Sequence, residues 1–447
     1  NPSAIKSALM TSSRQNIVRE DGTSQADPFD MGAGHIAPNS AVDPGLLYEI
    51  ETEEYDAYLC MTDQPRLEPD QCEEIESNGL AIAAKDLNLP SIAITELVSS
   101  ETVTRKVRNP GFDNQFQVEI DTPEGLEVIV TPKVLNLSTD DTAEFTVQFT
   151  NTNEFDNEWL YGGITWVSDE HRIYSPFMVK PTLFSFTPEI SIVNAPTTAS
   201  VNFEISFGDL SSYMASKTGL FKACTLPDEN ENDDICPFTN AKKTVQMIPG
   251  QSYEFVENPP ASVQRFIFTN DETDDLFMRF RITDDLVVGD GNDDLDLYLF
   301  HCNKPVGDEC SFSDYDPEPI GASFGPGSDH TIDIDASHNI MMAQPVGTFI
   351  LDVHGFQTDE SDGVPGAMFS VHAWSFGTDD LDNFVLSGDP VSPTSGATET
   401  LTVEWDGLDA ATYLGAVIHK QDADTTLGFT LLDIDTTLPA EDSAPDP

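Results

Sequence analysis

The chain has 447 residues, of which 79 are acidic and 20 are basic, so its formal net charge is −59. This charge excludes a nucleic-acid-binding protein, which needs a basic surface against phosphate, and a protein that docks on anionic membranes. No apolar run approaches the roughly 18 residues of a membrane-spanning helix, whereas a hydrophobic fraction of 39% is enough to build folded cores.

Residues 1–55 differ from everything that follows them. A short helix is predicted to begin at Pro2, with Ile5, Ala8 and Leu9 on one buried face. The N-terminus lacks an initiator methionine and the charged and apolar regions of a signal peptide, which predicts a mature product or a fragment. One helix in so short a segment cannot build its own core, so we expect it to pack against another part of the protein.

Six cysteines occur as three near neighbours, the first of them in a predicted linker over residues 56–88. An even number and close pairing predict three local disulfides in an oxidising compartment, and hence a secreted protein. The Cys-x-x-Cys or Cys/His spacing of a zinc site is absent. The predicted pairs are Cys60 with Cys72, Cys224 with Cys236, and Cys302 with Cys310.

From about Leu89 the sequence alternates between apolar and polar residues in short runs separated by turn residues, which indicates antiparallel sandwiches. The predicted fold class is therefore mostly β, with tandem β-sandwich modules after the short N-terminal segment. The predicted modules are a sandwich at 89–182, a second β-sandwich region at 183–376, a small sandwich at 377–440 and an acidic tail at 441–447.

Three motifs near the N-terminus resemble the closing stretch of the catalytic domain in subtilisin-like serine proteases. They are Pro2 to Thr11 (PSAIKSALMT), Pro28 to Pro38 (PFDMGAGHIAP) and Ala41 to Tyr48 (AVDPGLLY). Tyr55 to Cys60 is similar to the segment that follows in that family. The resemblance implies that residues 1–55 are the α/β tail of a subtilisin-like catalytic domain.

The later modules resemble domains that accompany such proteases. Residues 89–182, with Val103 to Asn109 (VTRKVRN), resemble a fibronectin-III-like module. Residues 264–376, with Asp293 to Leu299 (DDLDLYL), are similar to the jelly-roll-like pre-peptidase C-terminal modules of secreted bacterial proteases. The block around Trp405 resembles a small fibronectin-III-like terminal module. Together these similarities imply the C-terminal portion of a secreted bacterial subtilase.

A subtilase needs an Asp, a His, a nucleophilic Ser and an oxyanion-hole Asn. In the family all four precede the helix that begins here at Pro2, so the resemblance implies that this chain alone is inactive and has no catalytic residues. Ser24, in Gly-Thr-Ser-Gln-Ala, looks like the nucleophile motif. However, it follows that helix and lacks the continuation that holds such a serine at a strained turn, so we expect a polar loop.

Calcium is the candidate cofactor, because hard cations bind clustered carboxylate oxygens. For residues 290–296 the alternative is an acidic hairpin turn. For the chain as a whole the alternative is an acidic surface that is merely solvated. The eight histidines are dispersed without a metalloprotease pairing, and His354 and His372 are expected to be ordinary sheet residues. The candidate calcium ligands are Asp290, Asn292, Asp293, Asp294 and Asp296.

The predicted function is that of the non-catalytic C-terminal region of a secreted, extracellular serine endopeptidase. The expected partners are the catalytic domain and protein substrates, and a homodimer is a further candidate. The alternative is a stand-alone extracellular binding or adhesion module for glycan or protein matrix. The protease specificity, the ligand of the C-terminal modules and the association of the catalytic half stay open, because the substrate cleft would lie upstream.

Overall fold

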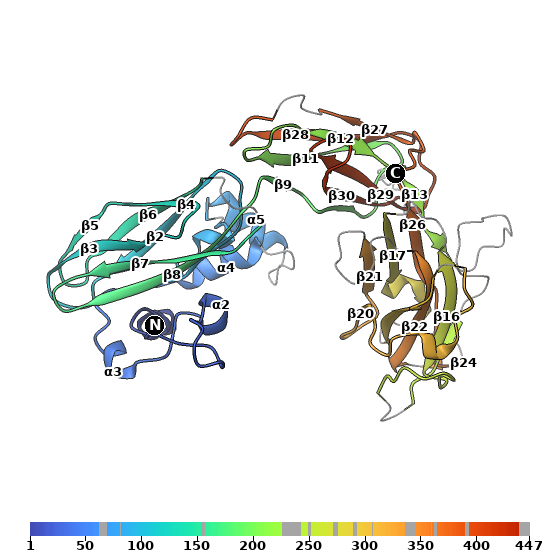
Figure 1. Cartoon of the computed structure of the whole chain (residues 1–447), viewed down its shortest axis with the longest axis horizontal. Coiled ribbons are helices and arrows are strands. Elements are labelled where there is room, and N and C mark those ends of the chain that lie inside the picture. The colour runs from blue at the N-terminus through green and yellow to red at the C-terminus, as the bar shows by residue number, and fades with distance from the viewer. Residues whose placement is uncertain are drawn as a thin grey trace, which may run out of the picture. The chain divides into compact units, whose positions relative to one another are not determined.

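The computed structural model describes residues 1–61, 69–80, 82–152, 157–225, 243–248, 252–270, 276–288, 293–305, 307–335, 346–358, 360–361, 364–388 and 393–437. The architecture is mostly β, as predicted from the sequence (Figure 1). The chain forms two compact units. The first is Asn1–Phe186 with Ile205–Ser211 and Ser392–Glu399, and the second is Thr187–Glu204, Ser212–Val391 and Thr400–Pro447.

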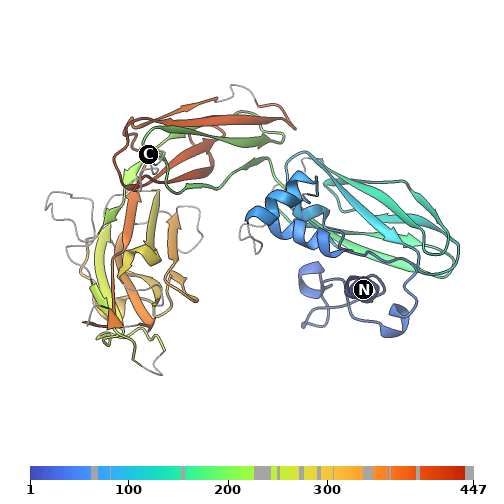
Figure 2. The same cartoon turned by 180° about the vertical axis from the view of Figure 1, so that it is seen from behind.

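The first unit opens with short helices that lie beside a β-sandwich (Figure 2). The predicted first helix is present, and its N-cap is Asn1, whose side chain accepts from the Ser3 amide. The predicted linker over 56–88 differs from the expectation, because it carries helices joined by the Cys60–Cys72 disulfide. The helices are α1 (Pro2–Thr11), α2 (Pro28–Met31), α3 (Pro38–Ala41), α4 (Thr52–Cys60), α5 (Pro69–Ser77) and the 3-10 turn η1 (Ala84–Asp86).

The buried face of α1 is not the predicted one. Ser3, Ser7 and Thr11, together with Ala8, are buried, whereas Ile5 is 64% exposed. The reason is hydrogen bonding: the Ser7 hydroxyl accepts from the Tyr48 amide at 2.8 Å, and the Ser3 hydroxyl accepts from the amide of Ile50 at 3.0 Å. Small hydroxyl side chains at i and i+4 let the helix approach this strand-like segment closely, and the large apolar side chains point elsewhere.

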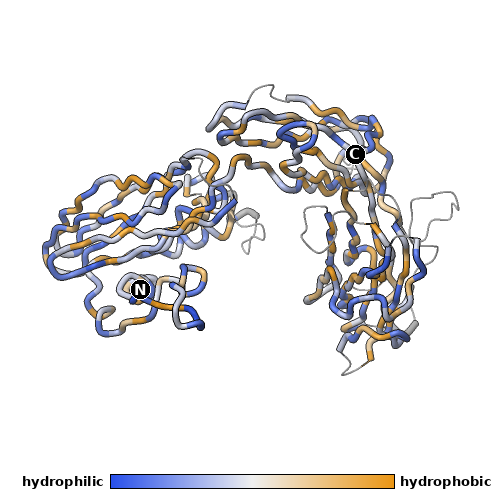
Figure 3. Tube along the Cα trace, in the orientation of Figure 1, coloured by the Kyte–Doolittle hydropathy of each residue, from blue (hydrophilic) through white to orange (hydrophobic). Residues whose placement is uncertain are grey.

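The sandwich of the first unit follows from sequence alternation, which Figure 3 shows as alternating hydrophilic and hydrophobic residues along its strands. The inward residues include Val103, Phe145 and Trp166, and Tyr48 of the N-terminal segment is buried in the same core. The segment therefore packs against another part of the protein, as expected. The sheets are β1 (Ile92–Leu97), β8 (Arg172–Pro181), β7 (Leu160–Val167), β3 (Asn114–Asp121) and β5 (Val134–Leu137), opposite β2 (Ser100–Arg108), β6 (Thr142–Asn151) and β4 (Leu126–Thr131); β9 (Phe184–Phe186) pairs with Ile205–Phe207.

The second unit contains a jelly-roll-like sandwich over residues 224–376. Its core is built by alternating apolar residues such as Phe280, Leu297 and Leu351 from facing sheets. The apolar stretch over residues 367–376 forms two short strands in different sheets. The strands are β14 (Cys224–Thr225), β26 (His372–Phe376), β17 (Phe277–Ile282) and β21 (His330–Asp335); β15 (Lys243–Val245), β25 (Ala367–Phe369) and β18 (Val287–Val288); β16 (Val263–Asn270), β22 (Gly347–Gln357), β19 (Asp294–His301) and β20 (Gly321–Ser323); β23 (Glu360–Ser361) and β24 (Val364–Pro365); and the 3-10 turns η2 (Asp284–Leu286) and η3 (Phe312–Asp314).

The C-terminal sandwich differs from the expected boundary at 376/377, because strands from before the jelly roll complete it. Ile190 pairs with Leu432 in a parallel ladder, and Ser216 pairs with Ile418 in an antiparallel one. The four strands after residue 377 do not close a core alone, and earlier strands pair with them and complete both sheets. The strands are β10 (Glu189–Ile192), β30 (Thr426–Asp435), β29 (Thr412–Lys420), β12 (Met214–Lys217) and β13 (Phe221–Lys222), with β27 (Phe384–Ser387), β28 (Thr398–Trp405) and β11 (Ala199–Phe207) in the other sheet.

A buried arginine joins the two sandwiches within the second unit. Arg279 in β17 is 2% exposed and donates to both carboxylate oxygens of Asp333 at 2.7 Å. It also donates to both oxygens of Glu189 in β10, at 2.8 and 2.9 Å, and to Asp433 in β30 at 3.2 Å. Arg281 pairs with the same Asp433 carboxylate. The guanidinium therefore binds three carboxylates from three other strands.

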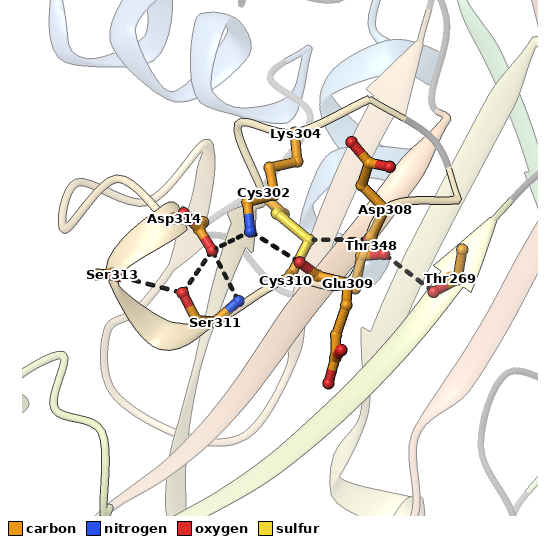
Figure 4. Close-up of a disulfide and its surroundings, with 10 residues drawn as sticks. All are labelled: Thr269, Cys302, Lys304, Asp308, Glu309, Cys310, Ser311, Ser313, Asp314 and Thr348. Atoms are coloured by element: carbon orange, nitrogen blue, oxygen red, sulfur yellow. Dashed lines mark hydrogen bonds and ion pairs between the residues drawn. A yellow bond between two sulfur atoms is a disulfide. The ribbon is translucent and has the colours of Figure 1, made fainter.

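The structure joins the cysteine pairs Cys60–Cys72 and Cys302–Cys310, the same pairs as expected. Cys224 is disulfide-bonded, and its predicted partner Cys236 lies outside the described residues. The close-up in Figure 4 shows the Cys302–Cys310 bridge beside an ion pair of 2.7 Å between Lys304 and Asp314. The bridge closes a short loop at the end of β19.

Replacing Cys302 and Cys310 together with alanine is expected to destabilise the second unit by about 2–3 kcal/mol, the loop-closure entropy of so short a ring. Urea unfolding of the second unit, followed by tryptophan fluorescence, measures this loss. The same replacement at Cys60 and Cys72 is the control, because it lies in the first unit and should leave the second transition in place. Coincident curves for the Cys302/Cys310 variant and the parent would contradict the prediction.

Candidate functional site

Ser24 does not have the surroundings of a nucleophile. It lies exposed in a turn between Val18 and Gln25, and its hydroxyl donates to the Asp21 carboxylate at 2.5 Å. The Asp21 carboxylate also accepts from the amides of Thr23 and Ser24 at 2.8 Å. These bonds lower the pKa of Asp21, since they stabilise its ionised form. The polar-loop interpretation of this motif therefore agrees with the structure.

The N-terminal segment instead presents an apolar groove. Ile5 is 64% exposed and Val42 is 85% exposed, and both line a cavity of about 360 Å³ together with Ala8, Leu9 and Pro44. Pro110 and Gly111 of the sandwich also line this cavity, and specific polar bonds fix the segment to the sandwich. Single exposed apolar residues are normal, but a groove of several on one segment marks an interaction surface.

The polar bonds that fix the segment are made by Tyr48 and its neighbour Glu49. The Tyr48 hydroxyl hydrogen-bonds the Ser175 hydroxyl at 3.0 Å, and burial raises the pKa of Tyr48 to about 12. The Arg108 guanidinium donates two hydrogen bonds of 2.6 and 3.0 Å to the Glu49 carboxylate. The Asn88 side chain donates to the Glu49 carbonyl at 2.9 Å. The segment is thus held in one place on the sandwich, which fixes the direction in which the groove faces.

The second candidate site is a cluster of acids and histidines in the jelly roll. Asp294 and Asp296 lie two residues apart in β19, so their side chains leave the same face of the strand. One oxygen of each carboxylate and one ring nitrogen of His330, the first residue of β21, all lie within 4.8 Å of one another. His354 in β22 is the direct cross-strand partner of Asp296.

The cluster is buried, and several of its polar atoms have no partner. Asp296 is 6% exposed, His330 is 7% exposed and His354 is 2% exposed. His330 Nδ1 lies 3.0 Å from the Ser323 hydroxyl, and His354 Nδ1 lies 3.4 Å from Asp296 Oδ2. Among the described residues, Nε2 of both histidines and Oδ1 of Asp294 are buried without a hydrogen-bond partner. Such groups are rare in folded proteins and call for a ligand.

Electrostatics within the cluster are unfavourable. Burial, followed by the negative charge of Asp296, raises the pKa of Asp294, and the two histidines offset only part of that effect. Burial and the charge of Asp296 also raise the pKa of Tyr298 to about 12. In the part of the chain that the structure describes, no lysine or arginine forms an ion pair with either carboxylate. The buried carboxylate of Asp296 and the half-buried carboxylate of Asp294 therefore lack a strong counter-charge.

A cavity of about 360 Å³ opens beside the cluster. Asp294, Asp296 and His354 form its polar wall. Tyr253 stacks on Tyr298 with ring centroids 3.8 Å apart, and Phe324, which is 68% exposed, stands at the rim. Solvent can thus reach the cluster through a cavity lined by the aromatic residues Tyr253, Tyr298 and Phe324.

Two of the five predicted calcium ligands, Asp294 and Asp296, meet at this site. Asp293 is buried beside them, and Asp290 and Asn292 lie outside the described residues. Calcium binding by the five residues stays a prediction. The sequence interpretation missed His330 and His354, which are 34 or more residues away along the chain. The only signal for His354 is its register opposite Asp296, and register is visible only in the paired sheet.

Comparisons with known proteins fit the sandwich of the first unit. Residues 86–179 match the fibronectin type-III domain family. Subtilisin-like protease SBT3.9 of Arabidopsis thaliana is 36% identical over 196 residues, which cover 40% of this chain and 25% of the relative. Subtilisin-like protease SBT3.18 of the same plant is 34% identical over 195 residues, again 40% of this chain and 25% of the relative. The chain thus spans about a quarter of the length of the curated relatives it matches.

Among solved structures, the secreted serine protease VesC from Vibrio cholerae is 9% identical, with 65% of this chain and 49% of that chain covered. Its TM-score of 0.19 carries no argument about fold or function. No helix among the described residues is long and apolar enough to cross a membrane. The domain match shows a fibronectin type-III domain, and the plant relatives show that part of this chain is similar to part of subtilisin-like proteases.

Proposed function

We propose that this chain is the non-catalytic C-terminal region of a secreted bacterial subtilisin-like serine endopeptidase, and that it stabilises the catalytic domain by packing against it. The observation that carries the proposal is the N-terminal segment. It is bonded to the fibronectin type-III sandwich through Tyr48 and Glu49, and it presents an apolar groove around Ile5 and Val42. Such a segment is suited to bridge the sandwich and a further globular domain.

The relatives support a catalytic domain as the occupant of the groove. They are subtilisin-like proteases of which this chain covers a quarter, so a catalytic domain is the partner that accompanies this region in them. The jelly roll, in this proposal, is a pre-peptidase C-terminal module that contributes to substrate handling. The disulfides Cys60–Cys72 and Cys302–Cys310 support an extracellular location, since such bonds persist in oxidising compartments.

The first test is labelling of the purified chain with a fluorophosphonate probe, alongside its intact mass and a subtilisin control. We expect no label, because Ser24, the serine of the nucleophile-like motif, is exposed and its hydroxyl donates to the Asp21 carboxylate rather than to a histidine. Label on Ser24 or another serine would overturn the non-catalytic assignment. Retention of the chain on immobilised polysaccharide or matrix protein would favour the stand-alone binding module.

The second test introduces Ile5→Asp into the longer polypeptide that the proposal requires. We expect a lower yield of folded, active protease, because a charge in the groove would be buried against the catalytic domain. In the isolated chain the same change should alter stability by no more than about 0.5 kcal/mol, since Ile5 is exposed there.

The matched control for Ile5→Asp is Val193→Asp, at a side chain that is 69% exposed in the second unit. It adds the same charge away from the groove and should leave the yield of active protease unchanged. Equal yields for both variants, or a source gene without an upstream catalytic domain, would overturn the proposal.

A further inference from the structure

The acid and histidine cluster of the jelly roll is a site for which the proposed function has no use. We propose that Asp294, Asp296 and His330 bind one divalent transition-metal ion of the Zn²⁺ class, with His354 as the residue that positions Asp296. The inference is independent of the protease assignment, because it rests on residues of the second unit alone.

The geometry of the three donors fits a small cation. Ligand atoms about 2.1 Å from a tetrahedral Zn²⁺ ion are about 3.4 Å apart. One oxygen of each carboxylate and one ring nitrogen of His330 already lie within 4.8 Å of one another, so small side-chain movements bring the three residues to an ion. They stand on β19 and β21 of the jelly roll, which are fixed by ladders to β22 and β17; β17, β21 and β22 are labelled in Figure 1.

The hydrogen bonds of the histidines leave the appropriate atoms available. Ser323 lies against Nδ1 of His330, so Nε2, which is buried and without a partner, is the nitrogen that an ion would bind. His354 Nδ1 lies beside Asp296 Oδ2 and can orient that carboxylate. Metal-binding sites use such outer partners to fix the orientation of the ligands. The unpartnered Oδ1 of Asp294 completes the set.

The donor types select the metal. Ca²⁺ takes six to eight oxygen ligands, whereas an imidazole nitrogen with carboxylates suits Zn²⁺ and its neighbours. The ion would also neutralise the two adjacent carboxylates, which have no lysine or arginine partner among the described residues. Three protein ligands leave a fourth position, and the adjoining cavity of about 360 Å³ gives water or another small ligand access to it.

The test is calorimetric titration of the full chain, freed of metals by a chelator, with Zn²⁺ and separately with Ca²⁺. Salt near 0.15 M suppresses loose binding to the acidic surface. We expect one saturable Zn²⁺ site, bound more tightly than Ca²⁺, and a higher unfolding temperature of the second unit in the presence of Zn²⁺. Asp294→Asn and His330→Gln should weaken Zn²⁺ binding by about 100-fold or more, and His354→Gln by about 10–100-fold.

The control is His35→Gln, which removes an exposed histidine of the first unit and should leave the affinity unchanged. Asp294 is half-buried and its Oδ1 has no hydrogen-bond partner, so we expect Asp294→Asn to keep the fold even if a buried histidine variant does not; circular dichroism checks this. Absence of saturable Zn²⁺ binding, or equal affinity in Asp294→Asn and the parent, would overturn the proposal. Tighter binding of Ca²⁺ than of Zn²⁺ would overturn it in favour of the oxygen-only site predicted from the sequence.

Discussion

Arg279→Met is expected to lower the free energy of unfolding of the second unit by about 3 kcal/mol. Removing one partner from a buried ionic network leaves an uncompensated charge, which lowers the free energy of unfolding by about 3–5 kcal/mol. Here we expect a loss at the lower end of that range. Asp433 still has its ion pair with Arg281, and the side chains of Glu189 and Asp333 are about a third exposed, so water can hydrate them. Urea unfolding at pH 7, followed by the fluorescence of Trp374 and Trp405, measures the change.

Two companion variants separate the network from the general effect of losing a cation. Lys222→Met removes a cation from an exposed pair with Asp409 in the same unit and should cost less than about 1 kcal/mol. Arg279→Lys keeps the charge but loses the planar fork that binds Asp333 and Glu189 with two bonds each, so we expect an intermediate loss. Equal stabilities of Arg279→Met and Lys222→Met would show that the network contributes nothing.

Mild acid is expected to destabilise the same unit through His419. This histidine is fully buried, with Nδ1 2.7 Å from the Tyr213 hydroxyl and Nε2 2.9 Å from the Thr430 hydroxyl. Burial lowers the pKa of His419 to about 3. Between pH 6.5 and 3 the unfolded chain therefore binds a proton that the folded chain does not, so stability falls as the pH falls through this range.

The expected slope is about 1.4 kcal/mol per pH unit for one such group, hence about 2–3 kcal/mol lost between pH 6.5 and 4.5. His372 adds a smaller slope of the same sign, since burial, and then the charge of Arg281, lowers the pKa of His372 to about 4. Glu189 does not interfere above pH 4.5. Burial opposes the shift, but the bonds from Arg279 prevail and the pKa of Glu189 is lowered, so its contribution is lost only at more acidic pH.

Urea unfolding of the parent and of His419→Gln between pH 7 and 4.5 tests the prediction. His419→Gln should be less stable at pH 7 but lose much less stability on acidification, because glutamine does not titrate. His35→Gln, at an exposed histidine, should follow the parent. If the parent and His419→Gln lose equal stability over this range, the acid sensitivity has another origin.

The alternation of apolar and polar residues predicted the positions of the long strands well, but it did not predict which strands pair with one another. The alternation in Val103 to Val107 and Phe145 to Phe149 is strong because one face of each strand is buried in the core. In α1 the apolar pattern predicted burial of Ile5. There the hydroxyls of Ser3 and Ser7 determine the buried face, because they satisfy backbone amides that no apolar side chain can satisfy.

Only part of the candidate metal site could be predicted from the sequence. Asp294 and Asp296 stand out in the sequence because they are acids at a spacing of two in an apolar strand. His330 and His354 do not, since each reaches the cluster through the pairing of distant strands. The short strands β10, β12 and β13 were also missed, because strands of two to four residues carry too little alternation to be recognised.

The sharing of strands on either side of the jelly roll makes that module a guest inserted into a host sandwich. The entry strand β14 and the exit strand β26 are hydrogen-bonded neighbours, with Cys224 opposite Ala373. Excision of the guest and splicing of its two flanks through a short turn should therefore leave a closed host. Truncation after residue 376, in contrast, would remove β27 to β30 and expose the apolar faces of β10 to β13. A proteolytic nick within the guest would leave both fragments held together by the ladders of the host.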